Sequence, residues 1–250
     1  MFDLAKFSLK EMTECGADIR RLGTQGGSFE EVAVRTVRYL YTHLVDVGTA
    51  QPACALVRFF KTHPYEELTP DLQRFAAERL GRRPDSPEMK CFALMASAGQ
   101  LPEWNDRTRS ARFKAIPISG DGFVAQFPMF SQLMTQFGVD LHALLKPSSN
   151  LLVDSHETTF NVFFVPEAVG SPYVPGQDQF VIPFGVKSVL GFGSLLPSGE
   201  LFAVILFSKI LIARETADLF KTMALCAKLA VLPFDGGALF ADEPFRIEPA

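Results

Sequence analysis

The chain has 250 residues, of which 48% are apolar and 21% charged, with a net charge of −4. These values are typical of a folded globular protein and exclude a disordered chain. The negative charge argues against a nucleic-acid partner, which would require a clustered basic face. The longest apolar run, Leu201 to Phe207, is too short to cross a bilayer, so we expect no membrane insertion.

Phenylalanine is unusually frequent, with 24 Phe against 4 Tyr and 1 Trp. Phe adds buried area without a polar group that needs a partner, which predicts a thick core or a pocket with apolar walls. The 4 cysteines contain no CxxC pair, and each lies among apolar residues: Cys15, Cys54, Cys91 and Cys226. We therefore expect reduced thiols and a cytoplasmic protein.

The first half of the chain predicts two helices and then a mixture of strands and short helices. Apolar residues at steps of three and four predict a helix over residues 2–22. Ser28 and Glu31 have the spacing of a capping box that opens a second helix, ending near Val45. The elements expected next are strand 53–60, helix 70–80, strand 91–98 and strand 115–118.

The second half predicts mostly β-structure between two helices. We expect a helix over 128–145, with Pro128 in its first turn. The strands expected after it are 159–165, 179–183, 187–195 and 201–207, and the continuous apolar run of the last implies cover on both sheet faces. A final helix is predicted over 214–232. The order indicates an α+β fold, an antiparallel sheet covered by helices.

This order of elements resembles the GAF domain, a small-ligand sensory module of bacterial signalling proteins. The capped helix from Ser28 and the strand after it resemble the opening of that family. Residues 181–193, Val-Ile-Pro-Phe-Gly-Val-Lys-Ser-Val-Leu-Gly-Phe-Gly, resemble its late apolar-Pro-apolar signature, and Arg214 opens a helix similar to its terminal one. PAS-like sensors share this layout. The resemblance implies a GAF/PAS-like sheet with the N- and C-terminal helices packed on one face.

The resemblance also implies a domain division and partners. We expect an N-terminal dimerisation helix at 1–27, a sensory domain at 28–234 and a linker or tail at 235–250. Apolar stripes on more than one side of the terminal helices predict a homodimer through them. In the resembled family the last helix often continues into a kinase or cyclase output domain, as in two-component signalling.

The expected ligand pocket lies between the sheet and the helix at 128–145. The residues predicted to bind the ligand are Phe130, Phe137, His142, Phe163 and Phe184. His142 also offers one axial imidazole for haem, against the alternative of a helix-end histidine near the carbonyl dipole. The pattern identifies neither the ligand nor a cofactor, and it predicts no metal site. The run Asp154-Ser155-His156-Glu157 favours a polar loop over a metal site, since adjacent residues do not easily face one ion.

No catalytic motif occurs in the sequence, so we expect a non-enzymatic regulatory domain that senses a small molecule. One alternative is an interaction and dimerisation module whose pocket is filled by its own Phe side chains. The other is thiol-redox chemistry at Cys54 and Cys91, as in the GAF-like free methionine sulfoxide reductases. Their apolar surroundings favour buried, inert thiols instead.

Overall fold

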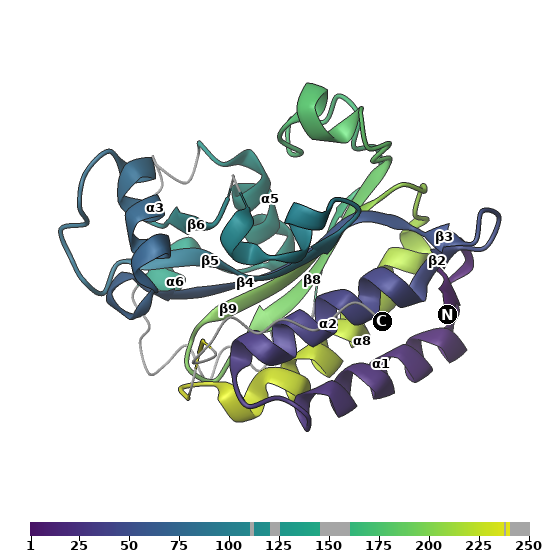
Figure 1. Ribbon diagram of the computed structural model, residues 1–250, viewed down its shortest axis with the longest axis horizontal. Coiled ribbons are helices and arrows are strands. Elements are labelled where there is room, and N and C mark those ends of the chain that lie inside the picture. The colour runs from purple at the N-terminus through teal and green to yellow at the C-terminus, as the bar shows by residue number, and fades with distance from the viewer. Residues whose placement is uncertain (111–112, 121–125, 146–160, 238, 241–250) are drawn as a thin grey trace.

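The computed structural model describes residues 1–110, 113–120, 126–145, 161–237 and 239–240, the side chains of 142 and 143 excepted. Its centre is a six-stranded antiparallel sheet with the strand order β6-β5-β4-β9-β8-β7. The predicted α+β class, an antiparallel sheet covered by helices, is confirmed (Figure 1). The strands of this sheet are β4 (Cys54–Pro64), β5 (Lys90–Gly99), β6 (Ala115–Pro117), β7 (Val162–Val165), β8 (Ser188–Leu195) and β9 (Leu201–Ser208).

A second, three-stranded sheet joins the start of the chain to the end of the second helix. Its strands are β1 (Phe2–Asp3), β2 (Leu44–Asp46) and β3 (Gln51–Pro52). The α-helices are α1 (Leu9–Gly23), α2 (Phe29–His43), α3 (Pro70–Leu80), α5 (Pro128–Phe137), α6 (Leu141–Leu145) and α8 (Arg214–Val231). The shorter helical turns are η1 (Leu4–Lys6), η2 (Tyr65–Glu67), η3 (Pro102–Asn105), η4 (Arg107–Arg109), η6 (Gln177–Val181) and η7 (Leu232–Phe234).

Helices α2 and α8 cover one face of the main sheet, and α1 packs against these two helices (Figure 1). α1 packs closely against α8 because it presents glycines there: a Cβ on Gly16 would lie 2.7 Å from the Cys226 sulfur, and one on Gly23 would lie 2.4 Å from the Ala230 carbonyl oxygen. The apolar stripe of α1 is buried in this core, which also receives Leu239 and Phe240 from beyond η7. The backbone oxygen of Leu239 accepts a hydrogen bond from Glu30 at the start of α2.

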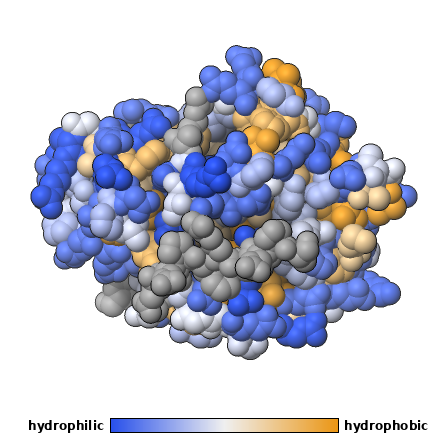
Figure 2. Space-filling model, in the orientation of Figure 1, coloured by the Kyte–Doolittle hydropathy of each residue, from blue (hydrophilic) through white to orange (hydrophobic). Residues whose placement is uncertain are grey.

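The other face is covered by α5, α6 and the segment from Ala168 to Val186. η6 lies in this segment as a π-helical turn, a geometry that is often found at functional sites. Figure 2 shows hydrophobic side chains gathered at the top of the molecule, where this segment lies, and Val169, Tyr173 and Ile182 are exposed there. No helix in the described part of the chain is long and apolar enough to span a membrane.

The structure corrects three predicted elements. The first helix begins at Leu9 instead of residue 2, because Ser8 and Glu11 form a full capping box there. The helix expected over 128–145 is broken at Gly138, whose φ of 69° ends α5 and separates it from α6. The strand expected over 179–183 is the helical turn η6, entered through Gly176 with a φ of 76°. At the second helix, Ser28 caps as predicted, while the Glu31 carboxylate accepts from Gly27 N–H.

A buried polar cluster lies where β4, β5 and β9 meet at one end of the sheet. The Lys90 ammonium lies 2.9 Å from a carboxylate oxygen of Glu200, and the hydroxyl of Thr62 donates to the other oxygen at 2.5 Å. Lys61 donates to His63 Nδ1 at 3.2 Å, and His63 Nε2 lies 3.0 Å from the Glu67 carboxylate. Burial, then the nearby Lys61 and Lys90 charges, lower the pKa of His63 to about 3.

This histidine predicts a specific loss of stability in acid. The imidazole takes up a proton near pH 6.5 in the unfolded chain and only near pH 3 in the folded one, so the unfolded chain binds more protons between these values. Stability from His63 is therefore complete above pH 6.5 and falls as the pH decreases, by about 2 kcal/mol between pH 7.5 and 5.0.

Urea unfolding of the protein and of His63→Gln at these two pH values measures the effect. Glutamine does not titrate, so the variant should lose about 2 kcal/mol less than the wild type. His43→Gln, at a partly exposed position on α2, is the control and should keep the wild-type pH dependence. An unchanged pH dependence in His63→Gln would contradict the assignment.

Candidate functional site

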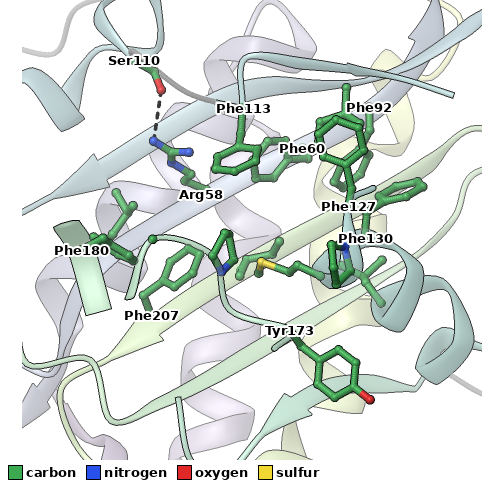
Figure 3. Close-up of a pocket in the computed structure, with 18 of the residues that line it drawn as sticks. Arg58, Phe60, Phe92, Ser110, Phe113, Phe127, Phe130, Tyr173, Phe180 and Phe207 are labelled. Carbon is green, nitrogen blue, oxygen red and sulfur yellow. Dashed lines mark hydrogen bonds between the residues drawn. The ribbon is translucent and has the colours of Figure 1, made fainter. Parts of the chain in front are cut away.

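A cavity of about 470 Å³ lies on the sheet face opposite α1, α2 and α8 (Figure 3). Its floor is formed by side chains of β4, β5 and β9, and its walls by α5, by the segment from Glu103 to Ser110 with Phe113, and by the segment from Pro172 to Phe180. The volume lies within the range of roughly 300–1,000 Å³ that is usual for small-molecule sites. It is a candidate ligand pocket that is formed by the fold itself.

Aromatic rings form a large part of the lining of this cavity (Figure 3). Phe60 stacks on Phe92 with centroids 4.8 Å apart, and Phe92 lies 5.0 Å from Phe130. On the other side Phe180 lies 5.5 Å from Trp104 and 5.1 Å from Phe207. Each of these aromatic groups therefore joins side chains of the floor to side chains of a wall.

Arg58 projects from the middle of β4 and places a charged group in the lining of the cavity. Its guanidinium donates to the hydroxyl of Ser110 at 3.1 Å, and Figure 3 shows it beside the ring of Phe113. Burial lowers the pKa of Arg58 to about 10, so the group is charged at neutral pH. The other charged side chains of the described lining, Glu103 and Arg109, are exposed.

Side-chain hydrogen bonds to the backbone hold the two wall segments. Gln177 donates to the carbonyls of Ala168 and Val174 and accepts from Gly170 N–H, which ties the turn before η6 into one unit. Asn105 bonds both the N–H and the carbonyl of Gly99 at 3.0 Å, which fixes η3 against the end of β5. These contacts explain why irregular segments can form a defined pocket wall.

The wall is also connected to the opposite face of the sheet. Arg107, in η4 next to Ser110, pairs with the Glu30 carboxylate at 2.5 Å, and both side chains are buried. Glu30 lies in the first turn of α2, and the Arg107 guanidinium lies over the ring of Phe240 at 4.9 Å. A shift of η4 would therefore change the contacts that Arg107 makes with α2 and with the end of the described chain.

The five predicted ligand residues are distributed over this face. Phe130 lines the cavity, whereas Phe184 lies behind the wall, 4.6 Å from the Trp104 ring. Phe137 and Phe163 are buried in the same apolar core but pack against β8, at Gly193 and Gly191 respectively. His142 belongs to α6, and its side chain lies outside the described residues.

Sequence reasoning missed Arg58 and the aromatic residues of β4 and β5. A signal was present, because Arg58 is the only charged residue within the apolar run from Ala53 to Phe60. A charge in a strand covered on both faces needs a special environment. The structure also places the ring of Trp104 in the cavity wall.

The cysteines lie away from the cavity. All four are free and buried, and burial raises the pKa of Cys15, Cys54 and Cys91 to about 12. β4 and β5 are neighbours, but Cys54 begins β4 while Cys91 pairs with His63 near its other end, so the two thiols are roughly 30 Å apart along the strand. A disulfide between them is excluded by this distance.

Metal ligands do not cluster in the part of the chain described here: no group of three or more His, Cys, Asp or Glu side chains could hold an ion. The run Asp154 to Glu157 lies outside the described residues.

No protein-family model matches the chain, and no curated protein matches it in sequence. Solved structures match in fold. A free methionine-R-sulfoxide reductase from Neisseria meningitidis in complex with its substrate is 13% identical, with 90% of this chain and 89% of that chain covered and a TM-score of 0.45. The GAF domain of a phosphoenolpyruvate-protein phosphotransferase from Coxiella burnetii is 11% identical, with 90% and 94% covered and a TM-score of 0.46.

A phycoerythrobilin-bound GAF domain from a cyanobacterial phytochrome is also similar, with 12% identity, 89% and 94% covered and a TM-score of 0.41. The first of these structures corrects our expectation that the chain is not an enzyme, because this fold also occurs in a reductase. Fold alone does not separate sensors from enzymes. The chain is thus similar in fold to GAF domains, the family that the order of its elements resembles.

The burial of the cysteines predicts slow thiol chemistry in the native protein. At pH 8, a thiol-specific reagent such as 5,5′-dithiobis(2-nitrobenzoate) should react with none of the four thiols quickly, because all four are buried. The absorbance of the released thiolate measures this, and the same sample in 6 M guanidinium should release four equivalents rapidly. Fast release of one or more equivalents without denaturant would contradict the buried arrangement.

Proposed function

We propose that this domain is a regulatory sensor that binds a small organic molecule in the aromatic cavity. The observation that carries the proposal is a pocket of suitable volume, lined by aromatic side chains and one partly buried cation, opposite the helices that would transmit a signal. A signalling role, an output kinase or cyclase domain and a cytoplasmic location belong to this proposal. The location is supported by the four free thiols.

The mechanism is a shift between two packings of the wall segment that carries η3 and η4. A ligand that contacts Ser110 and Arg58 acts on the segment that carries η4, and the buried Arg107–Glu30 pair joins that segment to α2. α2 in turn packs on β5 and contacts α1 and α8. A ligand biases such a system only by its different affinity for the two packings.

Filling the mouth of the cavity should abolish ligand binding. Met129 is a partly exposed lining residue of α5, so Met129→Trp adds volume there without overpacking the core. Wild-type protein incubated with a metabolite extract and desalted should show a bound small-molecule mass by native mass spectrometry, and the variant should not.

Val169→Trp provides the matched control, because Val169 is 60% exposed and outside the cavity. It should retain the bound mass. An absorption spectrum of the same samples would identify a chromophore such as haem, the alternative raised by His142. Wild-type protein of bare chain mass after this treatment would count against the sensor proposal.

A second role, self-association, is favoured by the outer surface of α8. Leu225, Leu229 and Leu232 follow one another at helical spacing and are 40%, 46% and 37% exposed. The apolar stripe of α1 packs within the chain, so α8 offers the apolar surface expected of a dimerising terminal helix. We propose that the homodimer forms through this face.

The dimer is tested by light scattering after size-exclusion chromatography. The wild type should have twice the mass of the 27.6 kDa chain, and Leu225→Glu/Leu229→Glu should have the mass of one chain, because two charges would be buried in the interface. Leu211→Glu, at a residue 63% exposed just before α8, should remain dimeric. A monomeric wild type at micromolar concentration would contradict the proposal.

A further inference from the structure

The position of Arg58 identifies the charge that the cavity accepts. β4 is buried along its length except at Arg58 and at its last residue, Pro64, and Arg58 is a lining residue of the cavity. Its neighbour on β9 is Ile205, and Figure 3 shows the ring of Phe113 beside its guanidinium. A cation in such an environment is disfavoured relative to water, which an anionic ligand group would offset.

The exposed charged residues at the edge of the cavity do not change the positive charge that Arg58 places inside it. Glu103 and Arg109 both line the opening, carry opposite charges and are exposed, so solvent screens them. The inner part of the described lining therefore carries one positive group. One guanidinium matches the planar fork of one carboxylate, whereas a phosphate ester would bring a second charge without a partner among the inner lining residues.

The aromatic lining residues indicate the chemical class of the uncharged part of the ligand. The stacked pair Phe60 and Phe92 lies on one side of the cavity, and Trp104, Phe180 and Phe207 form the other aromatic group. Ring faces and edges favour flat aromatic groups, which gain stacking or edge-to-face contact beyond simple burial. An aliphatic chain of equal size gains burial alone.

From these observations we propose that the ligand is an aromatic carboxylic acid, with its carboxylate on Arg58 and Ser110 and its ring between the Phe60–Phe92 pair and the Trp104–Phe180–Phe207 group. This inference rests on the proposed function, because it assigns the ligand class of the same cavity. Ser110 adds a hydroxyl beside the guanidinium and is itself buried. The carboxylate of the ligand would thus contact the wall segment that the Arg107–Glu30 ion pair connects to α2.

Trp104, the sole tryptophan of the chain, reports directly on the cavity it lines. We would excite Trp104 at 295 nm and follow its fluorescence while purified protein is titrated with 4-phenylbutyrate or with the neutral amide analogue, 4-phenylbutyramide. The acid should bind about tenfold or more tightly, since hydrogen bonds to a charged group are stronger than neutral ones. Decanoate, which has the same number of carbons as 4-phenylbutyrate, should bind more weakly than the aromatic acid.

Arg58→Gln should remove the preference for the acid and leave amide binding within about threefold. Arg109→Gln, which removes a cation from the exposed rim, should keep the preference. Arg58→Lys keeps the positive charge but lacks the planar pair of N–H donors of a guanidinium. Its preference for the acid over the amide should lie between those of the wild type and Arg58→Gln. If Arg58→Gln does not fold by circular dichroism, the comparison of acid and amide on the wild type still decides the matter.

Equal binding of acid and amide would overturn the inference and leave the cavity as a ligand site, so the proposed function would stand. Tighter binding of decanoate would overturn the aromatic assignment. Failure of all three probes to change the Trp104 signal would also overturn the inference, and native mass spectrometry after incubation with a metabolite extract would then judge the proposed function separately.

Discussion

The pairing of β4 with β9 at the centre of the sheet is the constraint on which the rest of the structure depends. All residues of β9 are buried, and β4 is buried on both faces over most of its length. Because a strand covered on both sides needs an apolar layer above and below it, the chain must supply two separate covers. α1, α2 and α8 form one, and α5, α6 and the η6 segment form the other.

The two covers are not equivalent, and that difference creates the cavity. Helices pack on the first face with close contacts, helped by the glycines of α1 that let α8 approach. On the second face the cover is made of a short helix, several helical turns and loops, which do not fill the space over Phe60, Phe92 and Phe207. Irregular cover of a sheet thus leaves a pocket whose walls are fixed by Gln177 and Asn105 through backbone hydrogen bonds.

Charged groups in the main sheet lie at two places, and each has a structural reason. Lys90 pairs with Glu200, which also accepts a hydrogen bond from Thr62, where three strands meet. Arg58 lies in the middle of its strand, where an apolar residue would stabilise the core without desolvation of a charge. A charge retained there agrees with a binding role, and its contact with Ser110 joins the floor of the cavity to its wall.

Local pattern predicted much of the fold. α3 was placed to the residue, β5, β6, β8 and β9 were placed to within about a residue at each end, and the apolar run of β9 indicated cover on both faces. These predictions held because binary pattern, Ser28 as a cap and Pro128 in a first turn act over a few neighbouring residues. The element order also led to the α+β class, an antiparallel sheet covered by helices. Prediction was weaker around Gly138 and Gly176, where positive φ angles turn a long helix into two and an apolar segment into a helical turn.

The sequence by itself determined the composition of the pocket, namely many Phe residues and one arginine inside an apolar strand. Only the tertiary structure decided which of them face the cavity. Phe130 lines it, while Phe137 and Phe163 are used against the glycines of β8, although all three looked alike as apolar residues. The physical reason is that a cavity forms where elements distant in the chain fail to close on one another, and register, strand neighbours and loop path decide this, none of which is encoded in local periodicity.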